Sequence, residues 1–377
     1  MDFNLCEHHK MIRNAAKDFA DKSVRPVAAE IDRKCEFPSD IVKQMGQMGY
    51  FGLQYPARYG GSDAGYIGLV LAAEQLSQAS MVTGAIMGVM SLTGEALLQH
   101  GSEKQKQAFL TPLASGELLA SFAFTEAATG SDPSAIETRA RLDGGDYIIS
   151  GQKQFVAMAH ASQIALVFAK DETGKVSAFL VDTSSPGFEM RHPCATMGAR
   201  GLCPSVVYLD DVRIPKKNFV GKKSDGYNIL MESMSIGKLV AAAEAVGVAQ
   251  EALDLSISYA KERTAYEKPI GDLLSIKWLL AEMHVRIAAS RLLAYEAAAL
   301  RDEEQSIMKE SATAKLFASQ SAVDVTRMAM QAHGAYGYMS DMTIERLYRD
   351  AKLTEIYEGV SEIQRTIIAN SLLRDNA

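Results

Sequence analysis

The chain has 377 residues, of which 47% are hydrophobic and 23% are charged, and its formal net charge is -7. A single hydrophobic core stops growing at about 250–300 residues, so this length predicts two or three domains of an ordinary soluble protein. Because the chain is acidic and has no long basic run, we exclude nucleic acid and anionic membrane surfaces as expected partners.

The N-terminal stretch, MDFNLCEHHK, lacks the apolar core of a signal peptide. No part of the chain approaches about 18 uninterrupted apolar residues, so the sequence predicts no membrane-spanning segment. The cysteines show neither a CxxC pair nor the spacing of a metal site; they are Cys6, Cys35, Cys194 and Cys203. Unpaired thiols are typical of a reducing compartment, so we expect a cytoplasmic protein without a metal centre.

The composition changes twice along the chain and predicts three domains. Residues 1–115 are rich in helix formers, which indicates an all-α domain. Residues 116–222 contain short β-prone runs such as YIIS, IALVFA and SVVYL between turn signals, which predicts an antiparallel β-barrel or sandwich. In residues 223–377 apolar side chains recur with helical spacing, which indicates a bundle of long helices. The predicted fold class is α+β and mostly α.

One segment of the middle domain carries residue types that suit a planar ligand. Thr125, Gly130, Ser131 and Phe155 would combine hydroxyl groups, a close backbone approach and a flat apolar face. A planar heterocycle that carries phosphates requires this combination. The same residues are also compatible with an ordinary turn and helix-capping residues, and the segment by itself leaves both interpretations open.

Glu358 lies in a turn near the C-terminal end, within the segment LTEIYEGVSEIQR. Ser361 followed by Gln364 is a capping-box pattern, so we expect a helix to begin at about Ser361, with Glu358 just outside it. An acid in that place either complements the positive end of the helix dipole or acts as a catalytic base.

Motifs spaced along the whole chain resemble the acyl-CoA dehydrogenase family in their residues and their order. They are TEAATGSDP, YIISGQKQF, MGARG, DDVRIPKKNFVG, ERTAYEKPIG, QAHGAYGY and RDAKLTEIYEGVSEIQR. The resemblance implies a helical domain, a β-domain and a C-terminal four-helix bundle. It also implies FAD as cofactor and a reaction that removes a proton from the α-carbon and a hydride from the β-carbon of an acyl-CoA thioester, which leaves the 2-enoyl-CoA.

By this resemblance Glu358 occupies the position of the catalytic base. Some members of the family place the base on the long helix of the third domain, where this chain has Gly237. We interpret Glu244, further along that helix, as an acid that faces other helices rather than as a second base. The backbone N–H of Glu358 is expected to stabilise the enolate that forms when the α-proton leaves.

The resemblance also assigns cofactor residues one at a time. The first group is expected to lie along the flavin: Phe122, Phe124, Thr125, Gly130, Ser131, Phe155, Val156, Ala157, Val360 and Glu362. The second group is expected to reach the cofactor of a neighbouring subunit: Arg263, Tyr266, Gln331 and Gly334. Polar side chains common in the family are replaced at Ala157, Ala265, Leu274 and Val360, so we expect FAD to be held less tightly or at a different redox potential.

The residues expected to contact the substrate are Ser131, Tyr357, Gly359 and Lys238, the last near the CoA entrance, where its charge suits the phosphates. In the family the helix of residues 81–101 lines the acyl end of the pocket, and here Gly84, Gly88 and Ser91 recur on one face. Such small residues either leave room for a branched, cyclic or moderately long acyl group or permit close helix packing. Residues 62–103 contain no Lys or Arg, so a dicarboxylic group such as glutaryl is disfavoured and a neutral acyl group is expected.

The resemblance further implies a homotetramer arranged as a dimer of dimers and an electron-transfer flavoprotein as the electron partner. Two alternatives to the dehydrogenase stay open at this stage. One is an enoyl-CoA reductase that runs the reversible half-reaction backwards. The other is a catalytically weak relative that binds acyl-CoA as a scaffold.

Overall fold

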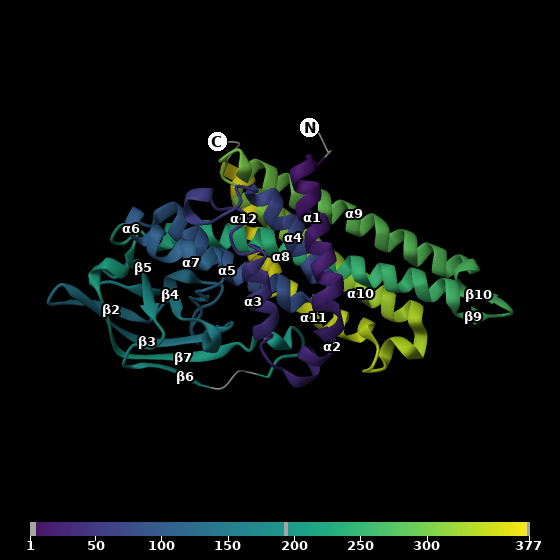
Figure 1. Cartoon of the computed structure of the whole chain (residues 1–377), viewed down its shortest axis with the longest axis horizontal. Helices are drawn as coiled ribbons and strands as arrows, with labels where there is room; N and C mark the ends of the chain where they lie inside the picture. The colour runs from purple at the N-terminus through teal and green to yellow at the C-terminus, as the bar shows by residue number, and fades with distance from the viewer. Residues whose placement is uncertain (1–4, 192–194, 375–377) are drawn as a thin grey trace.

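The computed structural model describes residues 5–191 and 195–374 and is mostly helical, with a β-sheet domain at one end and long helices that extend to the other (Figure 1). The predicted fold class is confirmed: helices precede and follow the sheet in the chain. The chain begins with helices α1 (Glu7–Phe19), α2 (Arg25–Lys34), α3 (Ser39–Gln47), α4 (Gly65–Ala79), α5 (Met81–His100), α6 (Glu103–Gln105) and α7 (Thr111–Ala114).

Helix α5 is apolar on all sides because it lies in the middle of the molecule. By length and composition alone it is the one helix among the described residues that matches a membrane span, yet 89% of its most apolar window is buried inside the protein. It packs against α4, which is also almost entirely buried. Burial between other helices therefore accounts for its composition.

The middle domain is one eight-stranded sheet in the order β6-β7-β3-β2-β4-β5-β8, and β1 joins it by pairing with β4. The strands are β1 (Ala120–Ala123), β2 (Arg139–Asp143), β3 (Asp146–Val156), β4 (Ile164–Lys170), β5 (Val176–Asp182), β6 (Phe188–Arg191), β7 (Ser205–Ile214) and β8 (Phe219–Val220). Most pairs are antiparallel, as expected, but β1–β4 and β2–β4 are parallel. These parallel pairs join strands that are not consecutive in the chain, which turn signals do not reveal.

The C-terminal part consists of α8 (Gly226–Glu262), the hairpin β9 (Thr264–Ala265) and β10 (Lys268–Pro269), α9 (Leu274–Asp302), α10 (Met308–His333), α11 (Thr343–Thr354) and α12 (Ser361–Arg374). Helix α8 contacts α4 and α5 of the N-terminal part and α9, α10 and α11 of the C-terminal part. The N-terminal helices and the bundle therefore share one hydrophobic core around α8, while the sheet has a second, smaller core of its own.

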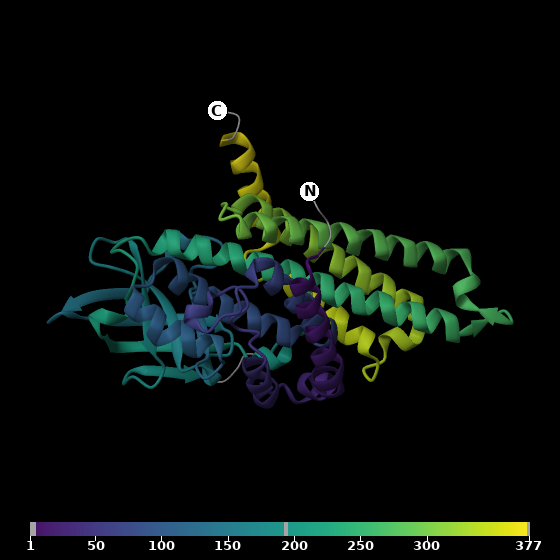
Figure 2. The ribbon, with the colours of Figure 1, turned by 45° about the horizontal axis from the view of Figure 1, so that its top comes forward.

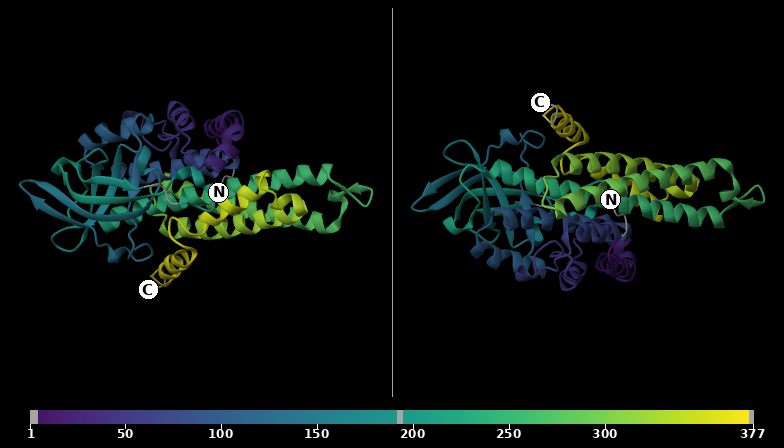
Figure 3. Two further views of the ribbon diagram at one scale, coloured as in Figure 1. Left: turned by 90° about the horizontal axis from the view of Figure 1, so that it is seen from below. Right: turned by 90° about the horizontal axis from the view of Figure 1, so that it is seen from above.

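Helix α12 contacts α10 and then extends beyond the rest of the bundle. It projects away from the body of the molecule, which is clearest when the top is tilted forward (Figure 2). Views from below and above show that it leaves on the side opposite the N-terminal helices (Figure 3). Its starting residue agrees with the sequence prediction, and the turn before it lines the cavity that forms the candidate site.

Candidate active site

A cavity of about 600 Å³ lies where the β-domain meets α5, α8 and the turn between α11 and α12. Most of the predicted site residues lie on its wall: Phe122, Phe124, Thr125, Gly130, Ser131, Phe155, Ala157, Lys238, Tyr357, Glu358, Gly359 and Val360. These residues come from the β-domain, from α8 and from the turn before α12, three segments far apart in the chain that converge on one space. Its size is within the range of about 300–1,000 Å³ that small-molecule sites usually have.

Glu358 stands on a strained turn in the wall of this cavity. Its φ is 54° and that of Gly359 is 87°, so two successive residues adopt the left-handed conformation. That conformation costs a non-glycine residue of order 1–3 kcal/mol and persists only where the surroundings enforce it. The Gln364 side chain does so by donating to the backbone oxygens of Glu358 (3.0 Å) and Gly359 (2.7 Å).

The predicted capping box at the start of α12 is therefore wrong in its contacts, although the helix begins where expected. In a capping box the Gln364 side chain would reach back to the backbone N–H at the helix start. It clamps the Glu358 turn instead, and the Ser361 hydroxyl is buried without a hydrogen-bond partner. The sequence pattern thus assigned Gln364 to helix capping, whereas its side chain holds the turn that carries Glu358.

The Glu358 carboxylate is enclosed and has cations near it, but its Oε2 accepts no hydrogen bond. Burial raises its pKa to about 7, and the charges of Lys238 and Lys315 oppose that rise. Burial in turn lowers the pKa of Lys238, which Glu358 partly offsets. A carboxyl group that titrates near neutral pH, lines a cavity and has an oxygen without a hydrogen-bond partner is suited to accept a proton.

Gly237 on α8 makes room for this carboxylate. A Cβ at this position would collide with Oε2 of Glu358 and would lie 2.8 Å from Leu92. A base at position 237 would therefore occupy the space that the Glu358 carboxylate fills, so a glutamate at position 358 requires a glycine at position 237.

The sequence predicted that Lys238 lies near the CoA entrance. Its side chain is instead 1% exposed and lies beside Glu358. Its Nζ donates to the backbone oxygen of Met234 at 3.2 Å. Lys238 follows Gly237 on α8, and this stretch of the helix is buried. The side chain therefore lies inside the protein. A role in binding the phosphates of CoA does not fit that location.

The glycine face of α5 does not line the cavity. A Cβ at Gly84 would meet Ser77 and Glu244, and one at Gly88 would lie 3.2 Å from Glu244 Oε1 and 3.4 Å from Val240. The face formed with Ser91 thus packs closely on neighbouring helices, and Ala85, Val89 and Leu92 form the cavity wall instead. The expectation of extra room for a branched or cyclic acyl group loses this support.

Glu244, interpreted from the sequence as a helix-facing acid, is buried where these glycines make space. Its Oε2 accepts a hydrogen bond from the Tyr357 hydroxyl, next to Glu358 in the chain. Burial raises the pKa of Glu244 to about 8, so it is mostly protonated at neutral pH. It is a neutral support for the Glu358 turn rather than a second base.

The β-domain supplies another part of the wall. Phe155 is 64% exposed and has a φ of 55°, and the β3–β7 register shifts between Lys153 and Val156. Such a bulge re-aims side chains, and here it turns the Phe155 ring and Ala157 toward the cavity. Val156 points the other way, into the core of the sheet, so its assignment to the aromatic wall is wrong.

A buried ion pair supports this wall from behind. Lys153 Nζ contacts Glu126 Oε1 at 2.6 Å and also donates to the backbone oxygens of Phe124 and Phe168. Glu126 in turn accepts from the backbone N–H groups of residues 137 and 138. The pair fixes the segment that carries Phe124, Thr125 and Ser131.

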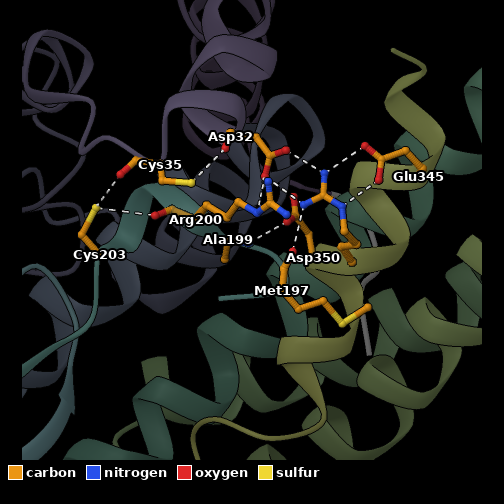
Figure 4. A network of polar contacts seen from close by, with 9 residues as sticks. Asp32, Cys35, Met197, Ala199, Arg200, Cys203, Glu345 and Asp350 are labelled. Carbon is orange, nitrogen blue, oxygen red and sulfur yellow. Dashed lines mark hydrogen bonds and ion pairs between the residues drawn. The ribbon is translucent and has the colours of Figure 1, made fainter. Parts of the chain in front are cut away.

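A polar network ties another part of the wall to two helices (Figure 4). Arg349 on α11 bonds Asp32 on α2 at 2.6 Å and the backbone oxygen of Met197 at 2.9 Å. The backbone N–H of Ala199 donates to Asp350 at 2.7 Å. Met197 and Ala199 both line the cavity, so this network holds the loop before β7 in place.

The remaining predicted cofactor residues lie outside the cavity. At the far end of the bundle, beside the β9–β10 hairpin, Arg263 stacks on Tyr336 with 5.8 Å from Cζ to the ring centroid. Tyr266, Gln331 and Gly334 belong to the same end and are exposed. Glu362 is exposed on α12, where it accepts a hydrogen bond from Arg365 at 3.3 Å, and it does not line this chain's cavity.

Sequence profiles of the acyl-CoA dehydrogenase N-terminal, middle and C-terminal domains match residues 6–117, 121–212 and 224–373. The chain belongs to the acyl-CoA dehydrogenase family. It is 39% identical over 373 residues to the 3-(aryl)acrylate reductase of Clostridium sporogenes, which covers 98% of this chain and 99% of that protein. It is 37% identical to the acryloyl-CoA reductase (NADH) of Anaerotignum propionicum (99% and 96%) and 38% identical to the human mitochondrial short-chain specific acyl-CoA dehydrogenase (98% and 91%).

Solved structures of this family share the fold. The butyryl-CoA dehydrogenase of Megasphaera elsdenii superposes with a TM-score of 0.97 at 32% identity, over 99% of this chain and 100% of that one. A chain from a study of the electron transferring flavoprotein of Acidaminococcus fermentans gives 0.98 at 35% identity (99% and 100%). An acyl-CoA dehydrogenase of Bacillus anthracis complexed with FAD gives 0.94 at 29% identity (99% and 68%).

The residues present fit a flavin. The wall offers a large exposed aromatic ring at Phe155, hydroxyl groups at Thr125 and Ser131 and the carboxylate of Glu358. No three His, Cys, Asp or Glu side chains gather as metal ligands within residues 5–191 and 195–374. Lys315, which the sequence analysis did not single out, lies beside this site, and its only signal was a cation among the Ala and Ser residues of the first half of α10.

Proposed function

We propose that the chain is an FAD-dependent acyl-CoA dehydrogenase that converts a neutral acyl-CoA thioester to the 2-enoyl-CoA, with Glu358 as the base that takes the α-proton. The observation that carries the proposal is that the Glu358 carboxylate, whose Oε2 has no hydrogen-bond partner, belongs to a residue that lines the same cavity as the exposed Phe155 ring. Family membership and the FAD complex of the Bacillus anthracis relative support FAD as cofactor. When bound, FAD supplies the acceptor for the hydride that leaves the β-carbon.

The chain's own residues account for the proton transfer. The positive charges of Lys238 and Lys315 offset part of the cost of a negative charge on Glu358 in an enclosed site. The hydrogen bond from the Gln364 side chain fixes the turn that carries Glu358. The backbone N–H of Glu358 is available to the thioester oxygen, where negative charge develops as the proton leaves. Thr125, Ser131, Phe122 and Phe124 line the flavin side of the cavity.

A neutral acyl group is favoured by how the charges of the wall are matched. Arg349 is paired with Asp32 and Glu345, and Lys352 with Glu355 at 2.6 Å. The α5 part of the wall is apolar, with Ala85, Val89 and Leu92. A distal carboxylate there would be buried without a counter-charge, which costs several kcal/mol.

The deciding experiment is anaerobic titration of the purified yellow protein with a panel of acyl-CoA thioesters, followed by flavin absorbance. We expect bleaching by a neutral acyl-CoA to be at least about tenfold more efficient than by glutaryl-CoA, a discrimination of about 1.4 kcal/mol. A protein that binds neither FAD nor acyl-CoA, or that prefers the dicarboxylic thioester, would contradict the proposal.

The reverse direction is the second candidate, because two of the curated relatives named above are reductases of acrylate-type substrates. The half-reaction is the same, and the electron partner sets its direction. Reoxidation of the reduced enzyme by a series of enoyl-CoA substrates, compared with reduction by the matching acyl-CoA substrates, would separate the two.

We also propose a cytoplasmic homotetramer, a dimer of dimers, that exchanges electrons with an electron-transfer flavoprotein. Large apolar side chains are exposed along α9 at Leu274, Trp278, Val285 and Leu292, and the last three are seven residues apart, as in a helix that packs on a partner. Arg263 and Gln331 lie outside this chain's cavity, so we assign them to the cofactor site of a neighbouring subunit. Light scattering that gives a monomer of 40.9 kDa at micromolar concentration would refute the tetramer.

The similarity to the Acidaminococcus fermentans chain supports an electron-transfer flavoprotein as the electron partner. The free thiols Cys6, Cys35 and Cys203 support a reducing compartment.

A further inference from the structure

Lys315 is a fully buried cation with a specific place behind the Glu358 turn. It lies on α10 and is 0% exposed. Its Nζ donates to the backbone oxygen of Gly359 at 2.7 Å, in the residue next to Glu358. Burying a lysine costs free energy unless its charge is matched, so a purely structural reason for this residue is weak.

The charge of Lys315 is matched by Glu358 across a gap, not by a direct ion pair. Lys315 and Lys238 approach Glu358 from α10 and α8, and both favour its ionised form. The Nζ groups of both lysines make hydrogen bonds to backbone oxygens, while Oε2 of Glu358 has no hydrogen-bond partner. Cations that stabilise a carboxylate without donating to this oxygen leave its lone pairs free.

We propose that Lys315 is a positioning residue of the active site, whose buried ammonium group favours the ionised form of Glu358 and whose hydrogen bond to Gly359 holds the strained turn that carries it. The inference rests on the proposed role of Glu358. The other ionisable groups that face Glu358 are Lys238 and Glu244 on α8 and Tyr357 on the turn. Those that face Lys315 besides Glu358 are Lys238, Glu355 and Glu362.

The two contributions of Lys315 predict different results for different substitutions. Lys315→Met keeps the length of the side chain and removes both the charge and the donor. Lys315→Arg keeps the charge and donors with a different head group. Lys175→Met makes the same change of charge at an exposed residue between β4 and β5, and it serves as the control.

The test measures the pKa of Glu358 directly, by infrared titration of its carboxylate band, which is identified by its loss in a Glu358→Gln protein. It is carried out on the FAD-loaded and on the FAD-free protein, in the absence of substrate. In Lys315→Met we expect that pKa to rise by about 1–2 units, because an opposite charge has been removed from a poorly solvated carboxylate. Lys315→Arg and Lys175→Met should stay close to wild type.

The pH profile of flavin reduction by acyl-CoA should move in the same direction as the pKa. A Lys315→Met protein that folds and melts at a lower temperature but keeps the wild-type pKa would overturn the proposal, because Lys315 would then only anchor the turn. If Lys315→Met does not fold, Lys315→Gln carries the same measurement. A shifted pKa with no acyl-CoA activity in the wild type would refute the proposed function, and only the effect of Lys315 on the ionisation of Glu358 would remain.

Discussion

Two regions of the molecule bury lysine side chains beside a glutamate, and they do so in opposite ways. In the β-domain Lys153 contacts Glu126 directly at 2.6 Å, and the hydrogen bonds of both side chains are satisfied. At the turn before α12, Lys238 and Lys315 surround Glu358 without bonding its Oε2. A satisfied pair holds a structure together, whereas an unsatisfied carboxylate retains the capacity to accept a proton.

The pKa values follow the same contrast. Burial would raise the pKa of Glu126, but the charge and hydrogen bond of Lys153 hold it below its ordinary value. At Glu358 burial dominates, and its pKa is raised to about 7 despite two lysines nearby. The first carboxyl is therefore locked in one state at neutral pH, and the second can change state.

The largest effect should come from removing the base. Glu358→Gln keeps the shape of the side chain and removes its basicity, so flavin reduction by acyl-CoA should fall by about 10²–10⁴ in stopped-flow measurements. Flavin content should persist. Glu189→Gln, the same change at an exposed residue of β6, should behave as wild type. Near wild-type reduction in Glu358→Gln would place the base elsewhere.

The satisfied pair should respond in stability. Lys153→Met leaves Glu126 as a buried carboxylate without its cation, so the free energy of unfolding should fall by about 3–5 kcal/mol in denaturant titration. Lys175→Met should stay within about 0.5 kcal/mol of wild type. A small loss for Lys153→Met would mean that the two regions do not differ as described here.

The space reserved for Glu358 is tested by Gly237→Ala. A methyl group there would collide with the Glu358 carboxylate, so flavin reduction should fall by about tenfold or more as the base is displaced. Helix propensity favours Ala by up to about 1 kcal/mol, so stability should change little. Unchanged reduction kinetics would show that the carboxylate tolerates the shift.

The neutral acid beside the turn predicts a pH dependence of stability. The pKa of Glu244 is raised by burial from 4.5 to about 8, so the folded state binds a proton that the unfolded state has released. Its stabilising contribution is complete below pH 4.5 and is lost as the pH rises toward 8. Unfolding free energies measured between pH 5 and 8 should therefore decline more in wild type than in Glu244→Gln. Parallel curves would mean that Glu244 is ionised in the folded protein.

The smallest expected effect concerns the flavin wall. Ala157→Thr adds a hydroxyl group where the cavity meets Phe155, and one hydrogen bond of about 0.5–1.5 kcal/mol corresponds to a change of about 10–30 mV in midpoint potential. Spectroelectrochemistry of the two proteins would measure it. Identical potentials would show that residue 157 does not meet the redox-active part of the flavin.

The sequence by itself determined the fold class, the start of α12 and the presence of Glu358 on a turn. Local composition and periodicity are sufficient for these features, because helix formers, β-prone runs and turn residues act over a few neighbouring positions. It also determined most of the cavity wall, because the family motifs name residues that the fold brings together.

Tertiary structure alone decided which side of each element faces the cavity. The spacing of Gly84 and Gly88 is the same whether they face a substrate or Glu244, and only the packing of α5 on α8 shows the latter. The period of a strand did not place Phe155 and Val156, since a register shift between β3 and β7 re-aims them. Lys238 and Lys315 are 77 positions apart in the chain. They become neighbours of Glu358 only because α8 and α10 pack side by side. Contacts between distant segments depend on how whole elements dock, and no local pattern carries that information.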